Sequence, residues 1–471
     1  MTQATTTRRG LLGGTATGNG RTLIRGADLL TMDAQLGEMK QADLLIEGDR
    51  IARIGRNLPA GSAEVIEGRG MILMPGMIDG HRHTWESPFL GELVKTEPKR
   101  YSNYIPFNNQ RVGVCMTAED VYFGNWLGGT VMIDSGVTSV LDQAHVIHTA
   151  EKGYAAAKGL QDSGIGGVFC FQITHSPTYG AGATLPAAQA AAEFGAPADE
   201  AHIAWAKATR DRYFTDASAP LRFGIGLSGL SVERGRTIDS VRWELEQARA
   251  LDPFLMTLHA HKVAHLEAAG LLGPDMHLSH GNGLSDAELA IMAKHDVKLS
   301  CSTMGEYAYD QPQAHGRARA AGVSVGIGMD VPVALNHDYF EHVRAGFWSL
   351  YRSPASTKLS NDYTSTDVLS FATSLGARSI GMGDVVGTLT EGKRADLVLL
   401  RTDRFGFASM GGLADRVVNF AHWQDIDSVW VAGAAKKRSG AMPGIDWRTV
   451  KMRAKAIQDR VIPQAQSIIF T

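Results

Sequence analysis

The amino-acid sequence predicts an α/β protein, in which a (β/α)8 TIM-like barrel carries a small β-sandwich domain formed by both chain ends. Three observations lead to this prediction. Short strand-like segments occur near both ends of the chain, strand-like and helical segments alternate between them, and polar residues stand directly after several central strands. A chain of 471 residues is long enough for one large barrel with an accessory domain.

Residues 22–73 and 387–440 are predicted to form the β-sandwich. Both stretches contain short apolar runs, such as Asp43-Leu-Leu-Ile-Glu and Ser428-Val-Trp-Val-Ala, separated by Gly, Asn and Asp. This pattern is typical of short strands joined by turns. Residues 441–471 are predicted to form a helical extension, which packs across the outside of the barrel or on a partner subunit.

Residues 74–386 are predicted to form the barrel, because strand and helix patterns alternate there. The run Val137–Asp142 is followed by a helical stretch over Ala150–Ser163 and then by a strand from Gly167, and Ser285-Asp-Ala-Glu has the pattern of a helix-starting capping box. Repeated units of this kind give a parallel sheet with right-handed crossovers. A doubly wound open sheet is the alternative, but no glycine-rich phosphate loop follows a first strand, which favours the barrel.

The composition is that of an ordinary globular protein, with 44% hydrophobic residues, 20% charged residues and a formal net charge of −3. It lacks the basic excess that would meet the phosphates of nucleic acid or of an anionic membrane. No run approaches the roughly 18 apolar residues of a membrane span. These features predict a protein with neither nucleic acid nor a membrane as partner.

Residues 1–21 are predicted to be a flexible N-terminal tail. Arg8 and Arg9 resemble the start of a twin-arginine export signal, but residues 15–20 supply no apolar segment after them. The three cysteines are widely spaced and form no CxxC pair, which fits a reducing compartment. We therefore expect a cytoplasmic protein, with a degenerate export signal as the alternative.

The segment Pro75-Gly-Met-Ile-Asp-Gly-His-Arg-His83 predicts a metal site. It follows the apolar run Met71–Met74, which is expected to be the first strand of the barrel. In a strand, the side chains of His81 and His83 point to the same face, so that both can bind one ion. Imidazole is a common ligand of zinc and of other divalent transition metals.

Three more polar residues, His259, His280 and Asp330, follow later strands of the predicted barrel. The carboxyl ends of all strands in a parallel barrel meet on one face, where active sites are built, so these residues should converge on His81 and His83. Three imidazoles and a carboxylate form a chemically sensible set around one cation and leave a position for water.

Structural alternatives exist for several of these histidines. His261 stands two residues after His259, on the same face of the strand, and competes with it for the ligand role. His280 could be a structural residue, whereas His277 and His265 are expected on the surface. For Asp330 the alternative is a turn or helix-capping residue.

The chain resembles the amidohydrolase superfamily, in the branch near the cytosine deaminases and the triazine hydrolases. The matching segments lie between roughly residues 22 and 440, and they are Pro75 to His83, Leu258-His259, His280-Gly-Asn-Gly-Leu-Ser-Asp, Gly326-Ile-Gly-Met-Asp330, Ala377-Arg-Ser-Ile-Gly and Gly387 to Leu400. The resemblance implies a metal-containing barrel with an added β-sandwich. It implies catalytic roles for Asp330 and for His280, which would lie near the bound water or the substrate, and it makes a homo-oligomer, dimeric or larger, the expected assembly. The implied metal ligands are His81, His83, His259 and Asp330.

Two departures from the superfamily pattern bear on the mechanism. Members with two metal ions carry a carboxylated lysine late on the fourth strand, whereas Leu221–Ser228 contains no lysine, which favours one divalent ion per chain. Aminoheterocycle deaminases carry a glutamate three residues after the fifth-strand histidine, and Lys262 stands at that position here. Glu306 could reach the same face from another strand, with an ordinary exposed loop glutamate as the alternative. The expected ion is zinc, with iron, manganese and cobalt as alternatives.

The predicted function is that of a metal-dependent amidohydrolase, in which an activated water hydrolyses a C–N bond of a small aromatic molecule. That bond belongs to an amide, a cyclic amide or a heteroaryl amine. Trp85, His175, Lys262 and Glu306 are the candidate substrate contacts, because they follow strands of the predicted barrel. The alternatives are an aminoheterocycle deaminase that releases ammonia, and an inactive barrel that serves as a binding or scaffold protein.

Overall fold

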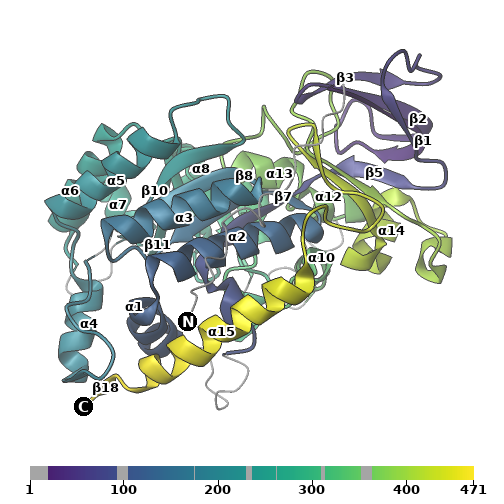
Figure 1. The fold of residues 1–471 in the computed structure, drawn as a ribbon. Helices are drawn as coiled ribbons and strands as arrows, with labels where there is room; N and C mark the ends of the chain where they lie inside the picture. The colour runs from purple at the N-terminus through teal and green to yellow at the C-terminus, as the bar shows by residue number, and fades with distance from the viewer. Residues whose placement is uncertain are drawn as a thin grey trace, which may run out of the picture.

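The computed structural model describes residues 20–92, 104–173, 175–229, 236–260, 262–308, 313–351 and 363–471. Most of the predicted tail, including Arg8 and Arg9, lies outside these ranges. The described chain forms a strand-and-helix barrel with a separate sheet at one end (Figure 1). No helix among the described residues is long and apolar enough to cross a membrane.

Eight parallel strands form the barrel, and neighbours in the ring follow the order of the sequence. The ring closes where Arg82 bridges Asp330. There the Asp330 N–H donates to the His81 carbonyl oxygen at 2.9 Å, and the His83 N–H donates to the Asp330 carbonyl oxygen at 3.0 Å. The predicted (β/α)8 fold is confirmed. The strands are β6 (Met77–Arg82), β7 (Val137–Ala144), β8 (Gly166–Gln172), β10 (Leu221–Gly229), β11 (Met256–Ala260), β12 (Met276–Ser279), β13 (Lys298–Cys301) and β14 (Val325–Ile327).

Helices cover the outside of this ring (Figure 1). The capping box predicted at Ser285 is present and starts α8, and the predicted helix Ala150–Ser163 is found with the same bounds. The segments between the barrel strands are η1 (Thr84–Phe89), η4 (Tyr104–Val112), α1 (Gly113–Cys115), α2 (Ala118–Asp134), α3 (Ala150–Ser163), β9 (Thr184–Leu185), α4 (Ala187–Gly195), α5 (Glu200–Tyr213), α6 (Ile238–Ala250), α7 (Val263–Ala268), α8 (Asp286–Lys294), η6 (Gly305–Ala308) and α9 (His315–Ala320). After β14 come α10 (Tyr339–Ser349), α12 (Ser365–Ser370) and α13 (Ser374–Ser379).

The accessory domain is one hydrogen-bonded sheet of eight strands drawn from both chain ends, rather than two separately bonded sheets. Leu44, Leu397 and Trp430 belong to one apolar core, so the N-terminal and C-terminal strands pack on each other across it. The strands are β1 (Arg21–Leu30), β2 (Glu38–Glu47), β3 (Arg50–Gly55), β4 (Glu64–Glu67), β5 (Ile72–Pro75), β15 (Leu397–Leu400), β16 (Ile426–Val431) and β17 (Ala434–Lys437).

The run Met71–Met74 is not the first strand of the barrel, as the sequence had suggested. It contributes to β5, which pairs with β15 in the accessory sheet, and the barrel begins only at Met77. Between the two lies Gly76, where an added Cβ would come within 2.1 Å of Thr138 Oγ1. The sequence does not predict β6 as a strand, because its buried residues include polar ones and it therefore lacks an apolar periodicity.

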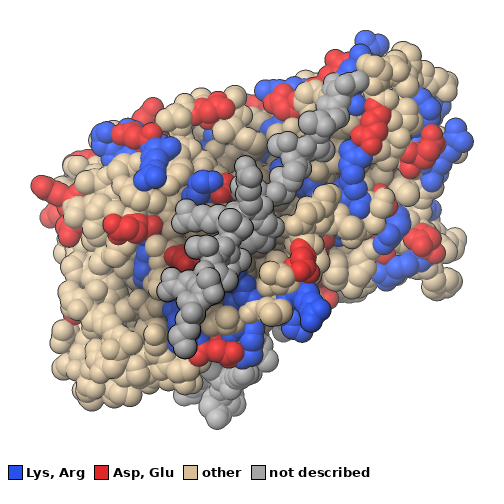
Figure 2. All heavy atoms as spheres, in the orientation of Figure 1, with Lys and Arg blue, Asp and Glu red and all other residues tan. Residues whose placement is uncertain are grey.

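The C-terminal part of the chain crosses the outside of the barrel as the long helix α15 (Trp447–Gln466) (Figure 1). Gln458 Nε2 donates to the Pro88 carbonyl oxygen at 2.6 Å, which fixes this helix on η1. The remaining elements are η7 (Phe405–Ala408), α14 (Leu413–Phe420), η8 (Trp423–Asp425) and β18 (Ile469–Phe470), of which the last pairs with β9. On the face drawn in Figure 2, basic and acidic side chains are interspersed among the described residues.

Candidate metal centre

The backbone at the ends of two barrel strands turns polar side chains towards the mouth of the barrel. His280, after β12, and Asp330, after β14, both have positive φ angles, of 77° and 73°. This region is uncommon for residues other than glycine and frequently marks functional sites. The hydrogen bonds from Asp330 to His81 and from His83 to Asp330 hold the aspartate between the two histidines.

Four of the predicted ligands come together at this mouth. Asp330 Oδ1 lies 3.3 Å from His81 Nε2 and 3.4 Å from His83 Nε2. The ring centroid of His259 lies 4.9 Å from that of His81 and 5.0 Å from that of His83. Potential ligand atoms of these three histidines all lie within 4.8 Å of one another. The structure therefore brings together His81 in β6, His83 directly after it, His259 in β11 and Asp330 in the segment that follows β14.

The spacing of Asp330 from the imidazoles of His81 and His83 fits a divalent ion. In tetrahedral coordination, two ligand atoms at about 2.1 Å from an ion stand about 3.4 Å apart. The distances from Asp330 Oδ1 to the two imidazole nitrogens match this value and are longer than the usual length of a hydrogen bond. His81 Nε2 is buried without a hydrogen-bond partner. His83 Nδ1 lies 2.8 Å from the Gln143 carbonyl oxygen, which leaves its Nε2 lone pair for a metal.

Burial keeps these imidazoles in the neutral form that binds metals. It lowers the pKa of His83 to about 3 and lowers the pKa values of His81 and His259 well below their usual range. Neutral imidazole and carboxylate are suitable ligands for zinc and for other first-row divalent ions.

Glu306 lies next to His280, so the alternative of an exposed loop glutamate is wrong. Its side chain is buried, its Oε1 lies 3.2 Å from His280 Nδ1, and its Oε2 accepts the Ser302 N–H at 3.2 Å. Burial raises the pKa of Glu306. Burial alone would lower the pKa of His280, but the charges of Asp330 and Glu306 raise it to about 9.

His145, Tyr104 and Glu86 form a hydrogen-bonded polar cluster beside the metal centre, and the sequence did not predict it. The His145 ring stacks on the His83 ring with 3.7 Å between centroids, and its Nε2 lies 3.1 Å from the Tyr104 hydroxyl. Tyr104 donates to Glu86 Oε1 at 2.6 Å, and burial raises the pKa of Glu86 well above its usual range. A signal for His145 existed, because β7 extends to Ala144 and the histidine follows a strand end like the others.

The other predicted substrate contacts lie in different surroundings. Trp85 is completely buried, and its indole N–H donates to His145 Nδ1 at 2.9 Å, so that it can act on a ligand only through His145. His175 is partly exposed after β8, with its ring 6.4 Å from that of His202. Lys262 is exposed at the start of α7.

Among the other histidines, His261 lies outside the described residues. His265 is exposed, as expected. The expectation that His277 lies on the surface is wrong, since its side chain is fully buried and both ring nitrogens have hydrogen-bond partners. Polar and apolar residues alternate in Met276–Ser279, and this pattern also fits a strand whose polar face lies in water, so it does not show that His277 points into the barrel.

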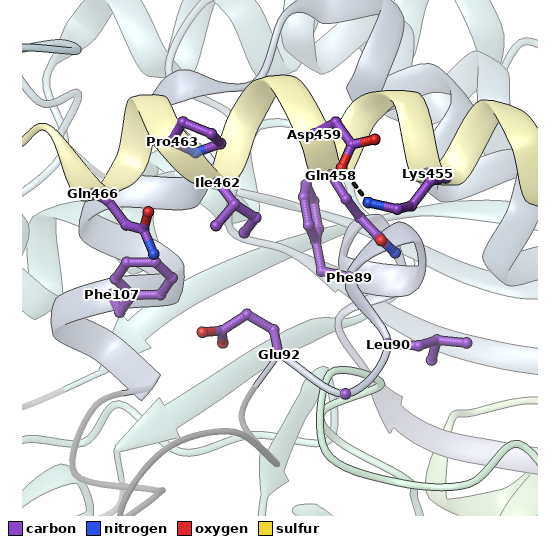
Figure 3. A pocket seen from close by; sticks show the side chains of 11 residues that line it. Phe89, Leu90, Glu92, Phe107, Lys455, Gln458, Asp459, Ile462, Pro463 and Gln466 are labelled. Carbon is purple, nitrogen blue, oxygen red and sulfur yellow. Dashed lines mark hydrogen bonds and ion pairs between the residues drawn. The ribbon is translucent and has the colours of Figure 1, made fainter.

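A cavity of about 540 Å³ lies between α15 and the segments that follow β6 (Figure 3). Phe89 and Phe107 line it on the barrel side, and Ile462 and Pro463 line it on the helix side. Among the described residues, none that lines this cavity is a predicted ligand or substrate contact.

Residues 251–436, which include His259, His280 and Asp330, match the model of the amidohydrolase family. The chain is 26% identical to a 5-methylthioadenosine/S-adenosylhomocysteine deaminase of Carboxydothermus hydrogenoformans, in an alignment that covers 88% of this chain and 92% of the relative. It is 24% identical to a 5'-deoxyadenosine deaminase of Methanobrevibacter smithii, over 89% of this chain and 94% of the relative.

Solved structures share the fold over nearly the whole chain. An adenosine deaminase from Xanthomonas campestris with bound zinc superimposes with a TM-score of 0.77 at 18% identity, covering 93% of this chain and 98% of the other. An atrazine chlorohydrolase from Arthrobacter aurescens, complexed with zinc, gives a TM-score of 0.74 at 18% identity, covering 93% and 99%.

Proposed function

The chain belongs to the amidohydrolase superfamily, and we propose that it is a hydrolase with one divalent metal ion that removes an amino group from a small heteroaromatic ring. The curated relatives that it matches over most of its length are named as deaminases of adenosine-type compounds. This supports C–N bond hydrolysis on a flat, nitrogen-containing ring.

His81, His83, His259 and Asp330 would hold the ion. Their spacing, the unpartnered His81 Nε2 and the neutral state of the imidazoles support this assignment. Zinc is the first choice, because two of the solved structures of the same fold contain it. When bound, such an ion supplies a water whose pKa is lowered to about 7.

The observation that carries the proposal is the contact of Glu306 with His280. In this proposal Asp330 accepts the proton of the attacking water. His280, with Nδ1 held by Glu306, has Nε2 left to donate to the oxygen or ring atom that gains negative charge. Glu306 supplies the second carboxyl group that the reaction needs to carry a proton to the leaving nitrogen, in place of the glutamate that Lys262 replaces.

Hydrolysis of an amide or a cyclic amide is the second candidate. Lys262 favours it, because an amide carbonyl needs no carboxyl group at that position to protonate a ring nitrogen. A panel of aminopurines, aminopyrimidines and cyclic amides separates the two, since only the amino-substituted rings release ammonia.

Metal analysis tests the proposal first. Plasma mass spectrometry of the wild type should give about one divalent ion per chain, and the His81→Ala/His83→Ala variant should lose both the ion and all turnover. His265→Ala, which removes an exposed histidine, is the control and should keep both. About two ions per chain would overturn the mononuclear assignment, and no ion after supplementation would overturn the hydrolase.

The proposal extends to the assembly and its location. The protein is proposed to be a cytoplasmic homo-oligomer with neither nucleic acid nor a membrane as partner. The net charge of −3 and the mixed charges on the face drawn in Figure 2 support the proposed lack of nucleic-acid and membrane partners. Light scattering after size-exclusion chromatography tests the assembly, and an elution mass of one chain would contradict it.

A further inference from the structure

A group of polar side chains occupies the barrel interior next to the metal centre. Barrel interiors of this kind are normally filled by branched apolar side chains. Here Thr257, His277, Ser279, Ser300 and Ser379 are all completely buried. Buried polar groups need hydrogen-bond partners to offset the loss of water, so their contacts carry information about what they support.

These side chains connect His81 to a backbone carbonyl through successive hydrogen-bond contacts. From His81 the contacts run to Ser279 (Nδ1 to Oγ, 3.0 Å), Thr257 (Oγ to Oγ1, 3.3 Å), His277 (Oγ1 to Nδ1, 2.8 Å), Ser300 (Nε2 to Oγ, 2.9 Å), Ser379 (Oγ to Oγ, 3.3 Å) and the Gly376 carbonyl oxygen (2.8 Å). We call these residues, from His81 to Ser379, the interior relay.

The strand register explains how the relay forms. Thr257 on β11 stands directly beside His277 on β12, and Ser279 is two residues further along the same face. Gly80 makes room for Ser300, because an added Cβ there would lie 2.2 Å from Ser300 Oγ. Strand β11 thus carries both His259 and Thr257 of the relay. Strand β6, which carries His81, faces Ser300 of the relay at Gly80.

One direction of donation satisfies the whole relay. The carbonyl of Gly376 can only accept, so Ser379 donates its hydrogen there. Burial lowers the pKa of His277 well below its usual range, so this ring is neutral and has one N–H. If His277 donates from Nε2 to Ser300, its Nδ1 accepts from Thr257, which leaves the Thr257 oxygen to accept from Ser279. Ser279 then accepts from Nδ1 of His81.

The same direction is the one that a metal requires. A metal on His81 Nε2 needs the tautomer with the hydrogen on Nδ1, and that hydrogen must have an acceptor. We propose that His277 is a positioning residue of the metal centre, which holds the tautomer and the ring orientation of His81 through Thr257 and Ser279. This inference rests on the proposed function, because it concerns the affinity of the same metal site.

Metal titration of paired variants tests the inference. Thr257→Val keeps the shape of the side chain but breaks the relay, and Thr257→Ser keeps the hydroxyl. Thr257→Val and His277→Leu should each weaken zinc affinity by about 10- to 100-fold, measured by competition with a chromogenic chelator. Thr257→Ser should stay close to the wild type. His315→Leu removes a buried histidine whose Nε2 bonds to the Gly346 carbonyl, outside the relay, and should not change zinc affinity.

A spectroscopic readout separates positioning from a general loss of stability. In the cobalt-substituted protein, Thr257→Val should change the visible absorption bands of the metal, whereas Thr257→Ser and His315→Leu should not. If His277→Leu fails to fold, the threonine pair still decides. Wild-type zinc affinity and cobalt spectrum in Thr257→Val would overturn the inference and leave the proposed function standing. A wild type that binds neither zinc nor cobalt would overturn the proposed function itself.

Discussion

Buried Glu306 and partly exposed His280 form an ion pair beside the proposed metal ligands, and each can be tested by one substitution. Glu306→Gln keeps the shape and a hydrogen bond to His280 but removes the carboxyl group that can carry a proton. Its turnover is expected to fall by about 100-fold with metal content unchanged. Glu246→Gln, on the exposed side of α6, is the control. Steady-state kinetics with ammonia detection measures the effect, and undiminished turnover would remove Glu306 from the mechanism.

His280→Ala probes the group that Glu306 supports. The variant should still bind the ion, because the other four residues supply the ligand set, but its turnover should fall by about two to four decades. Metal content and turnover are measured on the same preparation. Loss of the ion together with activity would reassign His280 as a ligand, since its ligand atom groups with those of His81 and Asp330 within 4.8 Å.

Lys152 makes the stability of the folded protein depend on pH. Its side chain is buried, its Nζ donates to the Gly113 carbonyl at 2.9 Å, and burial lowers its pKa from 10.5 to about 8. The unfolded chain therefore binds the proton more tightly, and stability contributed by this group rises as the pH rises from about 8 to 10.5.

Lys152→Met removes that dependence. The stability of the variant relative to the wild type should decrease by about 2 kcal/mol between pH 7.5 and pH 9.5, in urea unfolding at both values. Lys158→Met, on the exposed side of the same helix, should show no such trend. A constant difference between Lys152→Met and the wild type would mean that the buried amine stays charged at both pH values, as it does in the unfolded chain.

At the scale of elements, helices that begin with a side-chain cap are the elements that the sequence predicts most accurately. In α8 the Ser285 side chain accepts the Glu288 N–H, and Glu288 Oε2 accepts the Ser285 N–H at 3.0 Å. Ser285→Ala should lower the free energy of unfolding by about 1 kcal/mol without changing metal content. Denaturant unfolding checks this, with Ser62→Ala in an exposed turn as the control. Equal losses in both variants would show that the cap adds nothing.

The same contrast explains which elements the sequence could predict. Helix α3 and the start of α8 carry local signals in their caps and periodicity, and these signals do not depend on the rest of the chain. Strand β6 carries buried Asp79, His81 and Arg82, whose burial depends on partners far away in the sequence. Asp79, for example, accepts the Met329 N–H at 3.0 Å from beside β14.

The site follows a similar rule. Its proposed ligands could be predicted because each stands at the end of a strand in a spacing that the barrel topology brings together. The burial of Glu306, the stacking of His145 on His83 and the inward direction of His277 depend on how loops and strand faces pack. No local sequence pattern predicts those contacts.

At the scale of the whole molecule, Arg394 links the accessory sheet to the barrel. It is buried, pairs with Asp396 at 2.7 Å, and donates to the Pro220 carbonyl and to Ser139 Oγ, each at 3.1 Å. A buried ion pair of the accessory domain thus also donates hydrogen bonds to two residues of the barrel.

Arg394→Met should destabilise the protein by about 3–5 kcal/mol, because it leaves the Asp396 carboxylate buried without its cation. Arg438→Met, which breaks an exposed pair with Glu64, should cost at most about 1 kcal/mol. Unfolding in denaturant, followed by circular dichroism, compares the two variants. Adding Asp396→Leu to Arg394→Met should restore part of the loss, and an unchanged double variant would point to another cause.

The meeting of β6 with Asp330 has a consequence for the life of the protein in a cell. The backbone hydrogen bonds that close the ring and the side chains proposed to hold the ion belong to the same residues, His81, His83 and Asp330. An ion bound there would therefore also stabilise the contact between the first and last barrel strands, which we call the seam. Molecules without the ion are then expected to open first at that seam, and opened segments are where proteases cut. Inactive copies would thus be the short-lived ones, and the cell would clear them without a separate means of recognising them.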